Sequence, residues 1–136
     1  MTSPSSTPVT SAAALPGWWV GAALGFVAVA AGAFGAHALK ARLDPEQLAW
    51  WDTGASYLAL HAPAALVASL LEAQGRPRAR AARVLFGVGG VIFAGTLWAM
   101  ALGGPRWLGA VTPLGGLHLL AGWVALGWAG SRGVRA

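Results

Sequence analysis

Four long stretches of the chain carry no charged side chain: residues 1–39, 53–71, 84–105 and 107–131. A helix needs about 20 apolar residues to cross a bilayer, so each stretch is long enough for one crossing. Transmembrane strands alternate apolar and polar residues, whereas these stretches consist of Ala, Leu, Val and Gly without alternation. The pattern therefore predicts an all-α fold, an integral membrane four-helix bundle with short loops.

Residues at the ends of these stretches indicate where the helices begin. Trp18 and Trp19 suit a membrane interface, and Asp44, Pro45 and Gln47 form a helix start in which Asp44 is the cap. We expect membrane helices over about 17–39, 46–71, 83–102 and 113–130. A disordered N-terminal tail over 1–16 and a basic C-terminal tail over 132–136 are expected to flank them.

The first predicted helix carries small residues at helical spacing. Gly17, Gly21 and Gly25 recur every four residues, and Gly32 and Gly35 follow further along the helix. Small residues allow membrane helices to approach closely. We therefore expect Gly21, Gly25, Gly32 and Gly35 to form a helix-packing face, against which the other three helices pack.

Composition supports the membrane class. The chain is 57% hydrophobic and only 10% charged, with a mean hydropathy of +0.62, whereas about a quarter of the residues of a soluble domain are charged. The net charge is +5, but the basic residues lie at the ends of apolar stretches. Membrane orientation and anionic lipid explain such positions better than nucleic acid does. The chain has no cysteine, which excludes disulfides and thiolate metal sites.

The strongest cluster of positive charge follows the second predicted helix. Arg76, Arg78, Arg80 and Arg83 are expected to contact anionic lipid. Four crossings put both termini on the side of this cluster, so the positive-inside rule predicts that the N- and C-termini are cytoplasmic.

Few side chains at membrane depth can carry chemistry. His37, Tyr57, His61 and Thr112 are the candidates for a functional or polar core, and Thr112 also suits the cap of the fourth helix. Tyr57 and His61 are four residues apart, on one helix face, where the pair could relay a proton. In the structural alternative the two side chains bond each other, or His61 bonds the carbonyl of Ala59. That carbonyl is left unpaired because Pro63 has no N–H.

A haem held by two histidines requires both rings at nearly the same depth. At a rise of 1.5 Å per residue, His37 lies roughly 3 Å deep, His61 roughly 12 Å and His118 about 8 Å. This leaves His61 with His118 as the one open pair. We nevertheless expect no metal, no cofactor and no enzymatic activity, because the sequence contains no phosphate loop, nucleophile elbow or zinc spacing.

Four segments in order resemble a known family: AAGAFGAHALK, WDTGASYLALHA, FAGTLWAM and VTPLGGLHLLAGW. They are similar to the bacterial membrane family called domain of unknown function 423, whose eukaryotic counterpart is transmembrane protein 256. The resemblance implies a small multi-pass protein of the bacterial inner membrane with no established activity. His37, Tyr57, His61 and the stretch 112–116 match the pattern of that family, whereas His118 does not belong to it.

The leading hypothesis is a non-enzymatic structural or accessory component that packs with itself or with a larger membrane complex. The first alternative is a proton or small-solute pathway that uses membrane-embedded His and Tyr side chains. The second is a redox subunit that binds a cofactor.

Overall fold

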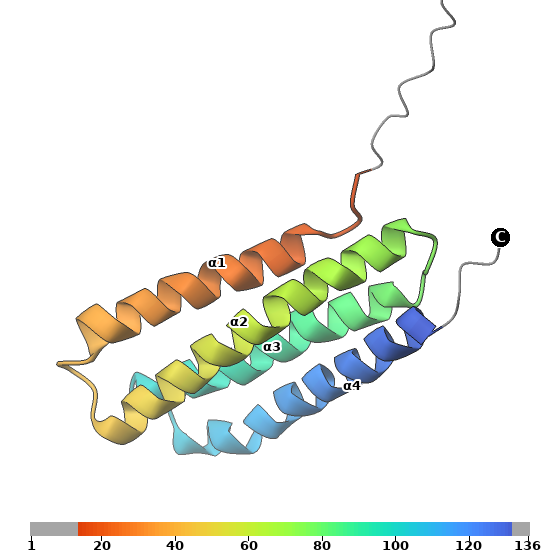
Figure 1. Ribbon diagram of the computed structural model, residues 1–136. Helices are drawn as coiled ribbons and strands as arrows, with labels where there is room; N and C mark the ends of the chain where they lie inside the picture. Colours follow the sequence, from red (N-terminus) through yellow and green to blue (C-terminus); the bar gives the residue numbers. More distant parts are fainter. Residues whose placement is uncertain (1–13, 132–136) are drawn as a thin grey trace, which may run out of the picture.

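The computed structural model describes residues 14–131, and within this range the chain is helical with no strand. The α-helices are α1 (Trp19–Phe34), α2 (Pro45–Ala73), α3 (Ala79–Ala101) and α4 (Thr112–Ser131) (Figure 1). A π-helical turn, η1 (Gly35–Leu39), prolongs α1, and a 3-10 helix, η2 (Arg106–Ala110), precedes α4. The predicted all-α membrane fold is confirmed, since four helices are long and apolar enough to span a bilayer.

The helix starts differ from the predicted ones where polar residues extend a helix beyond its apolar stretch. α2 begins at Pro45 because Asp44 caps it: the Asp44 carboxylate accepts from the Gln47 N–H at 2.8 Å, and the Gln47 side chain accepts from the Asp44 N–H at 3.1 Å. α3 begins at Ala79, ahead of the predicted residue 83. Arginines are tolerated there because a helix can continue outside the hydrocarbon. The predicted tails fall on residues 1–13 and 132–136, outside the described residues, apart from 14–16.

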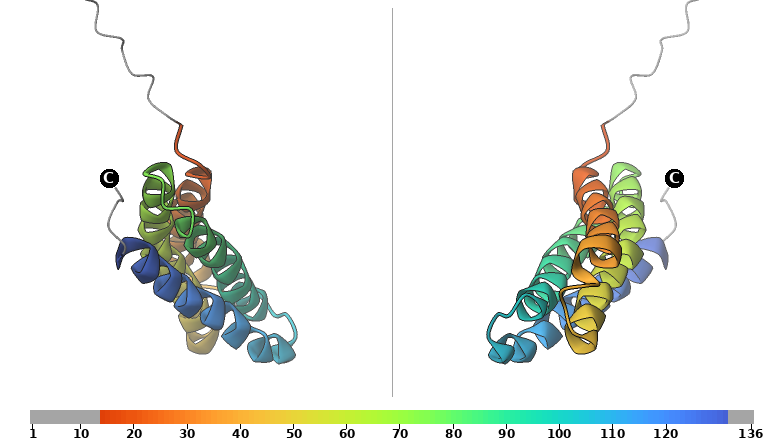
Figure 2. Two further views of the ribbon diagram at one scale, coloured as in Figure 1. Left: turned by 90° about the vertical axis from the view of Figure 1, so that its right-hand side faces the viewer. Right: turned by 90° about the vertical axis from the view of Figure 1, so that its left-hand side faces the viewer.

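The arrangement of the helices is open rather than closed. α2 packs against α3 along its length, α1 packs on α2, and α4 packs on α3. α1 meets α3 only at an edge, α4 meets α2 only at an edge, and in the described range α1 and α4 do not touch. In the views from either end, α4 lies on the side away from α1 (Figure 2). The expectation that all three later helices pack against the first is therefore wrong for the fourth.

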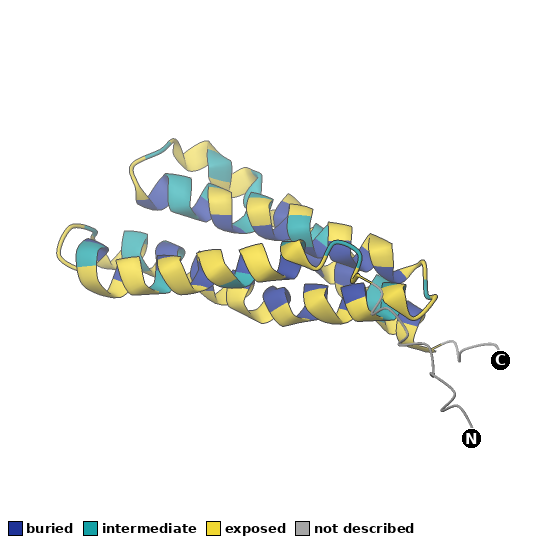
Figure 3. Ribbon diagram, turned by 90° about the horizontal axis from the view of Figure 1, so that it is seen from above, coloured by how far each residue is buried: buried dark blue, intermediate teal, exposed yellow. Residues whose placement is uncertain are grey.

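The core consists mainly of small residues, so the central helices lie close together. Ala65, Ala68 and Ala82 are fully buried, and Phe86 is the one large apolar side chain of the described residues that is fully buried. The outer helices are covered least: 28% of the most apolar segment of α1 and 17% of that of α4 are buried, against 50% for α2 and 39% for α3. Seen from above, exposed positions follow the outer faces of the helices (Figure 3).

Candidate functional site

Two tryptophans of the central helices link three helices by hydrogen bonds. The indole Nε1–H of Trp51 on α2 donates to the carbonyl oxygen of Ala31 on α1 at 2.8 Å. The indole Nε1–H of Trp98 on α3 donates to the carbonyl oxygen of Trp51 at 2.9 Å. The two rings are 5.1 Å apart between centroids. We call Ala31, Trp51 and Trp98 the tryptophan ladder. Each indole donor in it has a main-chain acceptor on a neighbouring helix.

Each indole ring of the tryptophan ladder packs against a glycine. A methyl group on Gly35 would lie 2.7 Å from Cδ1 and 2.9 Å from Nε1 of Trp51. A methyl group on Gly54 would lie 2.7 Å from Nε1 of Trp98. Gly35 also opens η1, where its carbonyl accepts from the N–H of Lys40 at 3.0 Å. The absence of a side chain at both positions is thus required by the indole that lies there.

His61 has a partner for each ring nitrogen. Nδ1 lies 2.6 Å from the main-chain carbonyl oxygen of Tyr57, and Nε2 lies 3.0 Å from the indole Nε1 of Trp123 on α4. A carbonyl only accepts and an indole only donates, so the tautomer with its proton on Nδ1 satisfies both contacts. The side chain is 3% exposed. His61 therefore connects α2 to α4.

Aromatic rings surround this histidine. Phe86 and Trp123 pack on it at centroid distances of 5.5 and 5.8 Å, and the Tyr57 ring lies 6.0 Å away. Tyr57 itself stacks on Phe93 of α3 at 4.3 Å. His61 thus bonds the main chain of Tyr57, whereas the sequence analysis expected the Tyr57 hydroxyl or the carbonyl of Ala59.

The histidines do not come together in the described part of the chain. His37 lies exposed on η1, and no hydrogen bond connects it to Tyr57 or His61. His118 donates through Nδ1 to the carbonyl of Leu114 at 2.7 Å, whereas His61 accepts a hydrogen bond from Trp123. Five residues separate His118 and Trp123 on α4, about 7 Å along the axis. The equal depth that a His61–His118 haem requires is not met.

Thr112 makes a polar contact between α3 and α4 and is the first residue of α4 rather than its expected cap. Its hydroxyl lies 2.8 Å from the hydroxyl of Thr96 on α3 and 3.2 Å from the carbonyl oxygen of Leu108. The hydroxyl of Thr96 lies 2.8 Å from the carbonyl oxygen of Ile92. One of the two threonine hydroxyls donates to the other, and this contact links α3 to α4 as interhelical hydrogen bonds in membranes do.

The glycines of α1 and η1 have different surroundings. A methyl group on Gly21 would lie 2.6 Å from Leu66 of α2, and Gly35 faces Trp51 as described. A methyl group on Gly25 would make an ordinary 3.5 Å contact with Ala62, and at Gly32 nothing lies within 4 Å. Gly21 and Gly35 therefore permit close approach inside this chain, whereas the space beside the half-buried Gly32 is left open by the described residues.

Three of the four clustered arginines contact groups of the chain itself. Arg76 donates to the carbonyls of Ala129 and Gly130 at 3.1 and 2.9 Å, at the end of α4. Arg78 lies 4.9 Å above the ring of Trp128. Arg83 pairs with Glu72, and Arg80 is exposed.

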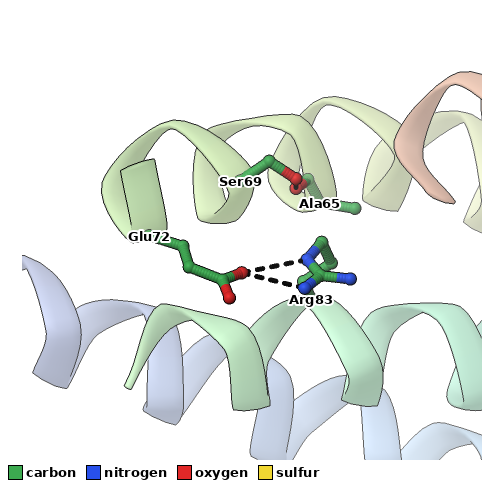
Figure 4. A network of polar contacts seen from close by, with 4 residues as sticks. All are labelled: Ala65, Ser69, Glu72 and Arg83. Carbon is green, nitrogen blue, oxygen red and sulfur yellow. Dashed lines mark hydrogen bonds and ion pairs between the residues drawn. The ribbon is translucent and has the colours of Figure 1, made fainter. Parts of the chain in front are cut away.

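The ion pair between Arg83 and Glu72 joins α3 to α2. The Arg83 Nη2 and Nε donate to one Glu72 oxygen at 2.8 and 3.3 Å (Figure 4). The side chains are only 11% and 17% exposed. Ser69, one turn before Glu72, donates to the carbonyl of Ala65 at 3.1 Å and is buried. The third guanidinium nitrogen, Nη1, points away from Glu72 in Figure 4.

Sequence reasoning missed the tryptophans as polar partners. Trp51 and Trp98 stand within the WDTGASYLALHA and FAGTLWAM segments, and Trp123 ends VTPLGGLHLLAGW. Tryptophan at membrane depth carries a donor that requires an acceptor. That signal was available in the sequence, although the identity of each acceptor was not.

Comparison with known proteins gives one consistent family. The family model described as "Protein of unknown function (DUF423)" matches residues 31–116, which include the whole tryptophan ladder and His61. A UPF0382 membrane protein of Haemophilus influenzae is 36% identical over 104 residues, covering 76% of this chain and 84% of the relative. No solved structure matches.

Two further relatives have the same family name. A Schizosaccharomyces pombe UPF0382 membrane protein is 35% identical over 115 residues, 80% of this chain and 96% of its own length. The UPF0382 inner membrane protein YgdD of Escherichia coli K12 is 37% identical over 103 residues, 75% of this chain and 79% of its own. With four membrane-spanning helices and these matches, the chain belongs to the DUF423, or UPF0382, family of membrane proteins of unknown function.

Proposed function

We propose that this protein is a non-enzymatic component of the bacterial inner membrane that assembles, with copies of itself or within a larger complex, through the face of α1 that carries Gly32. The observation that carries the proposal concerns Gly32, in the helix that also has Gly21 and Gly25 at a spacing of four residues. The missing side chain of Gly32 makes room for nothing in the described part of its own chain. Small residues in membrane helices favour close contact with another helix.

The polar contacts support a structural role over catalysis. The indoles of Trp51 and Trp98, both ring nitrogens of His61 and the hydroxyl of Thr112 bond to groups of the chain. Such contacts hold helices together in lipid, where apolar burial between helices contributes little. A catalytic site instead needs free groups that converge on a substrate.

A proton or solute pathway receives less support. His37 is on η1 at one end of α1, and His61 bonds to a carbonyl and an indole rather than to another titratable group. The cofactor alternative is weakened in the same way, because neither ring nitrogen of His61 faces an open position.

Charge supports an orientation with both termini in the cytoplasm. The α2–α3 loop lies at the same end of the bundle as the start of α1 and the end of α4 (Figure 1). Residues 72–83 at that end contain four arginines and one glutamate, whereas the opposite end has three basic and three acidic residues between 40 and 52 and at 106. The positive-inside rule assigns the arginine end to the cytoplasm.

The test is the substitution Gly32→Leu, measured as the oligomeric mass of the full chain extracted gently from its own membrane. The Cβ of the new side chain would meet nothing within 4 Å in the described residues, so the monomer should keep its thermal stability while the assembly dissociates. Gly95→Leu on α3 is the control for the choice of helix: a Cβ there also meets nothing within 4 Å, and assembly through α1 predicts that this variant keeps its oligomeric mass. Unchanged assembly of the Gly32→Leu protein, with wild-type stability, would contradict the proposal.

A further inference from the structure

The open arrangement of the helices leaves an apolar groove between α1 and α3, which we call the α1–α3 groove. Its volume is about 480 Å³, and its walls include Trp19, Val20 and Ala23 of α1 and Val84, Val88 and Val91 of α3. The groove exists because α1 rests on α2 and meets α3 only at an edge. Arg83 is the one charged side chain among its lining residues, and it lies at one end of the groove.

The length of the groove matches one lipid leaflet. On α3 the groove extends from Arg83 to Ile92, about nine residues or roughly 13 Å at 1.5 Å per residue. The hydrocarbon core of a bilayer is about 30 Å thick, so one leaflet contributes about 15 Å. The groove therefore begins at the membrane surface marked by the arginines and ends near the midplane. Apolar walls over this depth suit an extended acyl chain.

The mouth of the groove carries uncompensated positive charge. Glu72 binds Nε and Nη2 of Arg83, while Nη1 lies against Gly17, where a methyl group would overlap it. Arg80 is exposed three residues earlier on α3, close to the same face of the helix. The one carboxylate here, that of Glu72, pairs with Arg83, so the charge of Arg80 is not offset by it. This charge is complementary to a phosphate at the membrane surface.

A second groove, between α2 and α4, has different chemistry. Its volume is about 530 Å³, and Tyr57, His61 and Trp123 contribute polar edges to it. No charged side chain lines it, and the two nitrogens of His61 already have partners. The combination of an apolar, leaflet-deep wall with a cationic mouth therefore distinguishes the α1–α3 groove from the α2–α4 groove.

We propose that the α1–α3 groove binds one acyl chain of an anionic phospholipid, with the lipid phosphate at Arg80 and at Nη1 of Arg83. This narrows the expected lipid contact of the arginine cluster to two of its four members, since Arg76 and Arg78 contact α4. The inference does not depend on assembly through α1.

The experiment is native mass spectrometry of the purified full chain with added phosphatidylglycerol or with phosphatidylcholine of the same acyl chains. The wild type should retain one phosphatidylglycerol per chain. Its preference over phosphatidylcholine should be about fivefold or more, the effect expected of a single arginine near an anionic lipid. Arg80→Gln should reduce this preference toward equal binding, whereas Arg42→Gln at the opposite end should leave it unchanged.

The groove itself is tested by Gly87→Leu. A methyl group on Gly87 would already lie 3.0 Å from Cγ1 of Val20, so a leucine fills the groove and should abolish retention of the lipid. Gly95→Leu on the same helix meets nothing within 4 Å and should bind as the wild type does. If Gly87→Leu fails to fold, Val91→Phe replaces it, because Val91 lines the groove and is 67% exposed.

Three results would overturn the inference. If the wild type retains the two lipids equally, the anionic headgroup does not contribute to binding, and that part of the inference is wrong. Wild-type retention by a folded groove-filling variant shows that the lipid lies elsewhere. A groove-filling variant that changes the oligomeric mass but not the lipid count shows that a second copy of the chain occupies the groove.

Discussion

Gly35→Ala is the substitution that most directly tests the tryptophan ladder. The new methyl group would lie 2.7 Å from Cδ1 and 2.9 Å from Nε1 of Trp51, both too close for packed atoms. The Trp51 indole must move, and its 2.8 Å hydrogen bond to the carbonyl of Ala31 is then lost or weakened. Gly32→Ala is the matched control three residues earlier, where nothing lies within 4 Å.

The expected cost can be worked out from the separate effects. Replacing Gly by Ala in a helix stabilises by up to about 1 kcal/mol at either position, so this contribution largely cancels between the two variants. Loss of an interhelical hydrogen bond in a membrane costs about 0.6 kcal/mol on average, and up to about 1.7 kcal/mol. Forcing an extra methyl group into a packed site costs about 1–3 kcal/mol. Gly35→Ala should therefore be about 2–4 kcal/mol less stable than Gly32→Ala.

The assay is reversible unfolding in mixed micelles by titration with a denaturing detergent, followed by tryptophan fluorescence. The same pair of substitutions is then repeated in a Trp51→Ala background, where the ring that causes the collision is absent. The difference between the two alanine variants should fall to a few tenths of a kcal/mol there. Equal stability of Gly35→Ala and Gly32→Ala in the wild-type background would show that the Trp51 indole does not require the space beside Gly35.

Two further predictions concern other contacts between the helices. Trp98→Phe removes the donor to the carbonyl of Trp51. It should lower the free energy of unfolding by about 1 kcal/mol in the same detergent titration, and by more if the smaller ring leaves a cavity. An unchanged midpoint would show that this hydrogen bond contributes nothing to stability. Glu72→Gln weakens the largely buried ion pair with Arg83 and should lower the free energy of unfolding by about 1–3 kcal/mol. Glu46→Gln breaks the exposed ion pair with Arg106 and should lower it by less than about 1 kcal/mol. Equal effects of the two substitutions would show that burial does not strengthen the first pair.

The helices were predictable because their signals are local. The runs without charge indicate four crossings, and Asp44 with Gln47 forms the capping box that the sequence spacing requires. The early start of α3 at Ala79 was not predicted. The absence of charge marks where hydrocarbon begins, whereas a helix can continue into the headgroup region.

The partners of the polar side chains were not predictable, since they depend on how helices are placed in space. Nothing in the spacing of Tyr57 and His61 indicates that the main-chain carbonyl, rather than the hydroxyl, accepts from the ring. The match of His61 with Trp123 depends on the offset between α2 and α4. Likewise, Gly21 and Gly32 look alike in the sequence, but only Gly21 has a neighbouring helix that needs the space.

Native mass spectrometry of the untagged chain, extracted gently from its own membrane, is the direct test of assembly through the face of α1 that carries Gly32. We expect masses at multiples of 13.7 kDa above the monomer, or a larger complex that contains other subunits, and in either case dissociation by Gly32→Leu. A species at the monomer mass alone, under conditions that keep other membrane complexes intact, would contradict it.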